Sequence, residues 1–315
     1  MNSAQIFKQV NNLAERSRKN RSMLEGLFKF LFSASLVLSV LLLVLIALYI
    51  FWNGLQLFGT IAPFDVLTGI DWSPSSDKFG IFPMILSSLL ITFLAIMISA
   101  PIGIACAVCA AEISHNWYKN LIQAAVQILG GTPSVVFGLI GLSAIVPWIQ
   151  QFSNSSGLSI LAAVIILSIM ILPTIVVISQ DAIESVPHEL KQASLALGAT
   201  HFQTILKVIL PVAKPGITAA LVLSVSRAFG EAMAVKMVIG NRQTMPDFIP
   251  ETFFGLLSSA RTLTTNIIGD IEYAKEGSHL QALFMTGAVL FVVIMIVNYI
   301  AYVFTSKSAH LRGRS

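Results

Sequence analysis

Six long apolar stretches alternate with shorter polar segments along the 315 residues of the chain. Each stretch has about 20 or more mainly apolar residues, the length at which an α-helix crosses the hydrocarbon core of a bilayer. Prolines and glycines inside the second to fourth stretches favour a packed bundle, because neighbouring helices then satisfy the backbone groups that these residues free. The pattern predicts six transmembrane helices, over residues 30–52, 82–111, 121–149, 158–180, 212–239 and 281–304.

Charged residues are scarce, at 11% of the chain against 56% hydrophobic residues, and the mean hydropathy is +0.83. A soluble domain has about 25% charged residues, so this chain has too few to cover a surface in water. The first apolar stretch is also too long for a typical signal peptide. We therefore expect an all-α integral membrane protein, with a basic N-terminal tail over residues 1–29, a transmembrane domain over 30–304 and a short tail over 305–315.

The formal net charge of +4 raises the alternative of a nucleic-acid partner. However, thirteen of the 19 Lys and Arg lie in the two tails, in the segments that six spans place on the same side as the tails, or at the edges of those segments. Basic residues accumulate on the cytoplasmic side of membrane proteins. The charge distribution therefore predicts a multi-pass protein with both termini in the cytoplasm, and it does not require nucleic acid.

The fifth apolar stretch contains the sequence SVSRAFGEAMAVKM, residues 224–237, in which Arg227 and Glu231 lie four residues apart. A charge at the bilayer centre costs about 2.5–3.5 kcal/mol on insertion scales. One interpretation is a structural ion pair, since residues four apart on a helix can neutralise each other. Stability alone gives little reason for such a pair, because an apolar replacement is often as stable.

The other interpretation is a path for an oxyanion. Arginine stays charged and offers a planar fork of donors that matches phosphate. Glu231 can accept a hydrogen bond from the proton that phosphate carries near neutral pH, whereas sulfate has no such proton. Lys236, one or two turns further along, either extends to the interface between membrane and water or contributes to the substrate path.

Other polar positions carry weaker signals. Thr132 and Ser134 flank Pro133, and they can either present hydroxyl groups to an anion or allow close helix packing. Residues 240–280 can fold back into the membrane or dock a partner outside it. Cys106 and Cys109 have a spacing found in metal and redox sites, but both lie in an apolar stretch with no evident full ligand set. We expect no metal site and no catalytic residue.

Residues 181–211 separate the fourth and fifth stretches and read as helix, glycine, helix. Glu189 suits the positive N-terminal end of the first helix, and Gly198 supplies its stop. Thr200 and Gln203 form a capping box for the second helix. A short amphipathic helix of this kind can lie on lipid or insert into a groove on a soluble partner.

This segment resembles the cytoplasmic signature of ABC-importer permeases, which reads E-A-A-x-x-x-G, nine residues, then I-x-L-P. The matching residues are Gln192, Ala193, Ser194, Gly198, Val208, Ile209, Leu210 and Pro211. Gln192 stands where the family has Glu, which weakens any role for a charge there. The resemblance implies the type I ABC importer permease fold, with a coupling loop over 181–211 that docks onto an ATPase subunit. The residues expected to couple are Glu189, Gln192, Ala193, Leu197, Gly198, Leu210 and Pro211.

Four further stretches are similar to the C-type permease subunits of bacterial phosphate-specific importers: residues 130–142, 227–241, 261–270 and 282–293. Ala232 replaces the usual Thr of that family. The resemblance implies a subunit of the bacterial inner membrane that pairs with an A-type permease, two ATP-binding cassette subunits and a periplasmic phosphate-binding protein. The sequence has no G-x-x-x-x-G-K-[ST] phosphate-binding loop. We therefore expect no cofactor on this chain, and ATP-Mg on the partner ATPases.

Three alternatives remain open. The first is a permease for another oxyanion, such as phosphonate or sulfate. The second is a proton-coupled carrier that works alone, which a relay of intramembrane carboxylates would support. The predicted spans contain one central carboxylate, Glu231. The third is a membrane scaffold without transport, which leaves Arg227 and the coupling loop unexplained.

Overall fold

The computed structural model describes residues 3–113, 116–153, 156–243, 255–274 and 276–310. The chain divides into two compact units, residues 1–52 and residues 53–315. Helix α1 (Ser3–Leu55) contains both the basic N-terminal segment and the first predicted span.

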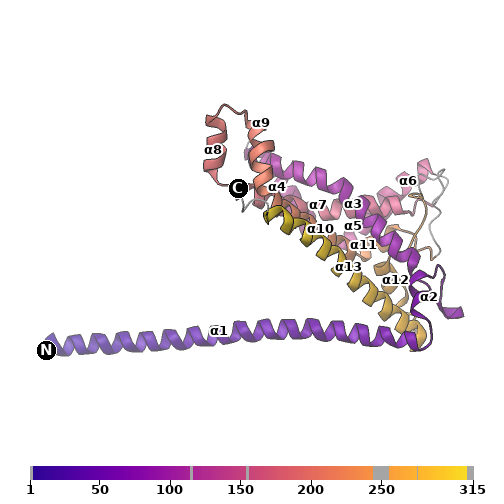
Figure 1. Ribbon diagram of the computed structural model, residues 1–315, viewed down its shortest axis with the longest axis horizontal. Coiled ribbons are helices and arrows are strands. Elements are labelled where there is room, and N and C mark those ends of the chain that lie inside the picture. Colours follow the sequence, from indigo (N-terminus) through magenta and orange to yellow (C-terminus); the bar gives the residue numbers. More distant parts are fainter. Residues whose placement is uncertain (1–2, 114–115, 154–155, 244–254, 275, 311–315) are drawn as a thin grey trace. The chain divides into compact units, whose positions relative to one another are not determined.

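The described residues of the second unit are mostly helical, with one small hairpin (Figure 1). Strand β1 (Trp72–Ser73) pairs antiparallel with β2 (Lys78–Phe79). The α-helices are α2 (Pro63–Thr68), α3 (Phe82–Val108), α4 (Asn116–Gly131), α5 (Ser134–Ile140), α6 (Val146–Phe152), α7 (Ile160–Glu184), α8 (His188–Ala196), α9 (His201–Thr204), α10 (Leu210–Gly230), α11 (Met233–Val238), α12 (Leu263–Asp270) and α13 (Ser278–His310). The tighter 3₁₀ turns are η1 (Gln56–Gly59) and η2 (Pro74–Ser76), and the wider π turns are η3 (Cys109–Ile113), η4 (Gly141–Ile145) and η5 (Ile205–Ile209).

Six helical segments among the described residues are long and apolar enough to cross a membrane. They are Glu25–Gly59, Phe82–Glu112, Ser134–Phe152, Ile160–Glu184, His201–Gly230 and Ser278–Ile300. The prediction of six transmembrane helices is therefore confirmed. The predicted limits of two spans, the third and the fifth, are wrong.

The predicted third span, residues 121–149, is two separate helices. Helix α4 ends at Gly131 and α5 begins at Ser134, so the apolar span is Ser134–Phe152. Pro133 explains the break, because proline lacks a backbone N–H and pushes the residue before it out of the helical conformation.

The predicted fifth span, residues 212–239, also has different ends. The helix begins at His201, runs through Pro211 by way of η5, and ends at Gly230. A separate short helix, α11, follows after Glu231 and Ala232. Pro211 is tolerated because it lies in the first turn of α10, where its missing N–H costs little.

Helix α7 forms the centre of the unit. Its most apolar window is 67% buried, against 22–28% for the other spans of the unit. Helices α3 and α10 pack against it at glycines. A Cβ on Gly103 would lie 2.7 Å from Cγ2 of Ile175, and one on Gly216 would lie 2.4 Å from Cβ of Ala182. Small residues at these crossings let the helix backbones approach closely.

The two ends of the unit differ. Helices α8 and α9 project from one end, and α2 and α12 lie at the other (Figure 1). The segment between α7 and α10 thus stands apart from the segment that contains α12. The predicted loop 240–280 is described only in part, since residues 244–254 and 275 lie outside the described residues, as do residues 311–315 of the predicted C-terminal tail.

Candidate functional site

A helix break positions Glu231. Helix α10 ends at Gly230, and Glu231 adopts an extended backbone, with φ −74° and ψ 125°. Its carboxylate Oε1 accepts a hydrogen bond from the backbone N of Ala234, at 3.3 Å. The first N–H groups of a helix have no partner inside the helix, so this bond satisfies one of those of α11. Glu231 therefore terminates one helix and caps the next.

Arg227 lies one turn earlier, and its side chain is exposed on α10. Its Nη1 donates to Oγ1 of Thr174 on α7, at 2.9 Å. The ion pairs among the described residues do not include one between Arg227 and Glu231. The structural ion pair, one of the two interpretations of this stretch, is therefore not formed among the described residues, because α10 ends between the two residues and Glu231 bonds the backbone of α11.

Glu231 borders a small cavity with room for about one water molecule. The polar part of its wall comes from Glu231 and four hydroxyl-bearing residues, Ser88, Thr92, Thr262 and Thr264. The rest of the wall is apolar and consists of Ile91, Leu167, Ala228, Phe229 and Val235. The Thr264 hydroxyl donates to the Glu231 carbonyl at 3.1 Å, and the backbone N of Leu263 donates to Ser88 Oγ at 3.0 Å. The start of α12 thus forms part of the cavity wall beside the helix break.

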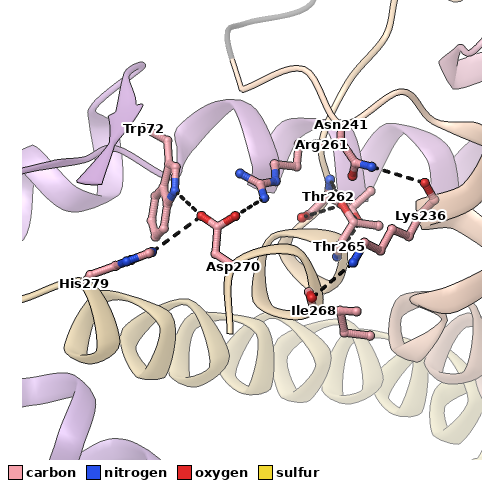
Figure 2. Close-up of polar contacts among 9 residues, drawn as sticks. All are labelled: Trp72, Lys236, Asn241, Arg261, Thr262, Thr265, Ile268, Asp270 and His279. Carbon is pink, nitrogen blue, oxygen red and sulfur yellow. Dashed lines mark hydrogen bonds and ion pairs between the residues drawn. The ribbon is translucent and has the colours of Figure 1, made fainter. Parts of the chain in front are cut away.

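Helix α12 is also bonded to α11. Lys236 Nζ donates to the Ile268 carbonyl at 3.2 Å, and Asn241 Nδ2 donates to the Lys236 carbonyl at 3.2 Å (Figure 2). To the two interpretations of Lys236 the structure thus adds a third, in which its side chain joins the two short helices α11 and α12. Sequence spacing gives no signal for it, because Lys236 and Ile268 are 32 residues apart.

Asp270, the last residue of α12, is the centre of a polar cluster (Figure 2). Its Oδ1 forms an ion pair with Arg261 Nη2, and its Oδ2 accepts from Trp72 Nε1 at 2.8 Å. His279 Nε2 lies 3.6 Å from the same Oδ2. Sequence reasoning missed this cluster, because its members come from separate segments of the chain.

Thr132 and Ser134 lie at the break between α4 and α5. The Thr132 hydroxyl donates to the Ile128 carbonyl at 2.6 Å, and Ser134 begins α5. Neither residue lines the cavity beside Glu231. Their predicted role toward an anion stays a prediction.

The coupling loop has the predicted form of helix, glycine, helix. Gly198 ends the first helix with φ +83°, and Thr200 and Gln203 make both bonds of the capping box. Glu189, Gln192 and Ala193 lie in α8, and Leu210 and Pro211 begin α10. Apolar side chains around the turn are exposed: Leu190 43%, Leu195 44%, Leu197 90% and Phe202 64%. These side chains form an apolar tip that the described residues leave uncovered.

Two ion pairs join the loop region to the bundle. Lys191 Nζ on α8 bonds Glu112 Oε1 in η3, and the two side chains are 14% and 8% exposed. Lys119 on α4 pairs with Glu184 at the end of α7 at 3.0 Å, with side chains 35% and 42% exposed. The first pair ties the coupling loop to the end of α3.

The two cysteines carry no sign of a metal site. Groups of three or more metal-binding side chains are absent from the part of the chain that the structure describes. Cys106 and Cys109 are both free thiols near the end of α3.

Comparison with known proteins gives consistent matches. The family described as "Binding-protein-dependent transport system inner membrane component" matches residues 99–309. The "Probable ABC transporter permease protein YqgH" of Bacillus subtilis strain 168 is 41% identical, over 90% of this chain and 93% of that protein. The "Phosphate transport system permease protein PstC" of Pasteurella multocida strain Pm70 is 29% identical, over 96% of this chain and 98% of that protein.

Among solved structures, a crystal structure of a bacterial ABC transporter involved in the import of the acidic polysaccharide alginate superposes with a TM-score of 0.57. It is 17% identical and covers 89% of this chain and 98% of that one. At that identity the match bears on the fold alone, and the fold is that of type I ABC importer permeases.

Proposed function

The chain belongs to the family of binding-protein-dependent transport system inner membrane components, and from this premise we propose that it moves inorganic phosphate across the membrane. It is a permease subunit of an ABC importer, a multi-pass inner membrane protein whose ATPase activity is supplied by separate subunits. The choice of phosphate is supported by full-length relatives that are named phosphate transport permeases.

The exposed guanidinium of Arg227 carries the proposal. Its described hydrogen bond is to a neutral hydroxyl, and the described ion pairs give it no carboxylate. A permanent positive charge on a transmembrane helix without a neutralising partner is costly unless an anion or water meets it. Since Arg227 lies on a span and its fork fits phosphate, it serves as the contact for the passing anion.

Glu231 tunes the same path. Its carboxylate is one turn beyond Arg227 and borders the cavity. A carboxylate repels a fully deprotonated anion and accepts a hydrogen bond from a protonated one, so it favours phosphate over sulfate. It also limits how tightly the anion is held, and a conduit must release what it binds.

The apolar tip of the coupling loop is the surface for the ATPase. Leu197 and Phe202 present apolar area at the end of the unit away from α12. A short helix with such a face fits a groove on a soluble partner. The full transporter then contains this chain, an A-type permease, two ATP-binding cassette subunits that hold ATP-Mg, and a periplasmic phosphate-binding protein.

The function is tested by anion uptake. The wild-type complex is reconstituted into proteoliposomes with the binding protein, and ATP-driven uptake of labelled phosphate and sulfate is compared at equal concentration. We expect phosphate uptake to exceed sulfate uptake at least about tenfold, a difference of about 1.4 kcal/mol. Glu231→Gln should narrow that ratio, while Glu272→Gln, which removes an exposed carboxylate, should not. Equal uptake of both anions by the wild type would exclude phosphate selectivity.

A further inference from the structure

Asp270 connects three segments of the chain (Figure 2), and its helix α12 lies at the end of the unit away from α8 and α9 (Figure 1). It contacts Trp72 from β1, Arg261 ahead of α12 and His279 from α13. The ion pair between Arg261 and Asp270 is largely buried, with the Arg261 side chain 5% exposed and the Asp270 side chain 15% exposed. The amide of Gln243 completes the cluster when its oxygen faces Arg261: it then accepts from Nη1 at 2.9 Å and donates to the Trp72 carbonyl at 3.1 Å.

Asp270 supplies the charge that Arg261 needs. Among the described residues, Arg261 Nε has no hydrogen-bond partner, and the carboxylate that pairs with the guanidinium is that of Asp270. An apolar replacement for a buried ion pair is often neutral or stabilising, whereas removal of one partner is strongly destabilising. Stability alone therefore explains the pair poorly, and the position that it fixes is the better explanation.

The fixed position is that of α12. Asp270 anchors the C-terminal end of this helix, while Thr262 and Thr264 at the other end form part of the cavity wall. Thr264 bonds the Glu231 carbonyl, and Lys236 of α11 bonds the Ile268 carbonyl. The C-terminal end of the helix is thus held by the cluster and by Lys236, and its N-terminal end by the bond to Glu231.

One buried group works against this position. Asn266 of α12 is fully buried, and neither atom of its side-chain amide has a hydrogen-bond partner in the part of the chain that the structure describes. A buried polar group without a partner destabilises the state in which it is buried. The contacts of α12 thus combine the ion pair at Asp270 with an unsatisfied side-chain amide four residues earlier. This arrangement suits a helix that leaves its position during the transport cycle.

We propose that Asp270 is a positioning residue that holds α12 closed over the cavity beside Glu231. In this position α12 blocks access to the cavity and to Glu231 from the end of the unit opposite the coupling loop. Loss of the Asp270 contacts opens that end. The inference rests on the proposed function, in that Arg227 and Glu231 are taken to line the path of the anion.

The test measures access to the cavity directly. Thr92, which lines the cavity from α3, is replaced by Cys in a Cys106→Ala/Cys109→Ala background. The rate of modification by a membrane-impermeant maleimide, per inserted molecule, is measured without phosphate. The modification rates in right-side-out spheroplasts and in inside-out vesicles are compared. The comparison identifies the side of the membrane from which the reagent reaches the cavity.

Three variants are compared with the parent. Asp270→Asn should raise the modification rate about tenfold, equivalent to about 1.4 kcal/mol lost from the closed state. Trp72→Phe removes the indole N–H that donates to Asp270, together with part of the buried ring, and should raise the rate about twofold to threefold. Asp77→Asn is the matched control: Asp77 is exposed, bonds Ser278 and has φ +48°, which Asn tolerates, so its rate should equal that of the parent.

A purely structural role for Asp270 would lower the amount of inserted protein and leave the rate per molecule unchanged. Parental rates in both Asp270→Asn and Trp72→Phe would therefore overturn the inference. If Asp270→Asn fails to insert, Trp72→Phe decides alone. Because phosphate is absent from the assay, an error in the proposed substrate leaves this outcome unaffected.

Discussion

The ion pair between Lys191 and Glu112 is the residue-scale contact that fixes the coupling loop. Both side chains are largely buried, and they are 79 residues apart in sequence. Removal of one partner would leave the other charged and without its counter-ion in a poorly solvated place. The pair between Lys119 and Glu184 joins neighbouring helices but is much more exposed, so water and salt screen it.

The two pairs should respond differently to loss of the lysine. Lys191→Met should lower the free energy of unfolding of the purified subunit by about 3–5 kcal/mol, as when a buried pair loses one partner. Lys119→Met should cost about 0–1 kcal/mol, because its pair is exposed. Thermal unfolding in detergent measures both. A Glu112→Lys/Lys191→Glu exchange should recover most of the loss, and equal effects of the two Met substitutions would contradict the assignment.

At the residue scale, the sequence predicts which charges lie in a span but not how they pair. Arg227 and Glu231 are visible because they interrupt an apolar stretch. The interpretation of the two residues as an ion pair assumed an unbroken helix, and the break after Gly230 removes that premise. The Asp270 cluster could not be predicted, since Trp72 and Asp270 are 198 residues apart and meet only through the packing of α12.

At the element scale, Gly198 determines the shape of the coupling loop. Its φ of +83° lies in a region that residues with a side chain rarely adopt, yet a Cβ there would meet nothing within 4 Å. The requirement for glycine is therefore one of backbone conformation and not of space. Asn, which visits this region at low cost, is the natural comparison.

We expect Gly198→Val to abolish coupling and Gly198→Asn to retain most of it. A β-branched residue disfavours positive φ, so Val should shift α8 relative to α9. Stimulation of ATP hydrolysis by the loaded binding protein measures the coupling. Gly59→Val is the control, because Gly59 also has open space around it but has no positive φ. Equal stimulation in Gly198→Val and the wild type would remove the loop from the coupling path.

The helix breaks mark the limit of pattern reading at this scale. Apolar periodicity predicts that a span exists, but both mistaken spans continue an apolar run past a backbone break. Pro133 was a visible signal for the first break. The second break lies at Glu231 and Ala232, where capping by the Glu231 carboxylate replaces helix continuity, and composition alone does not indicate it.

At the scale of the whole molecule, the proposed orientation puts the coupling loop in the cytoplasm and α12 outside. A Cys replacing exposed Tyr273, just after α12, should react with an impermeant maleimide in intact cells. A Cys replacing His188, which is exposed at the start of α8, should react only after the cells are opened. The reverse pattern would invert the orientation and separate the coupling loop from cytoplasmic ATPases.

The central claim is that Arg227 meets the transported anion, and the most direct measurement is phosphate uptake by an Arg227→Gln transporter. The variant is assembled with its partner subunits in proteoliposomes, and equal incorporation is verified. We predict that the initial rate of ATP-driven phosphate uptake falls about 10- to 100-fold, because a hydrogen bond to a charged group contributes about 1.5–3 kcal/mol. Lys214→Gln, which removes an exposed positive charge near the other end of α10, should leave the rate unchanged. Uptake at the wild-type rate by an equally assembled Arg227→Gln transporter would contradict the claim.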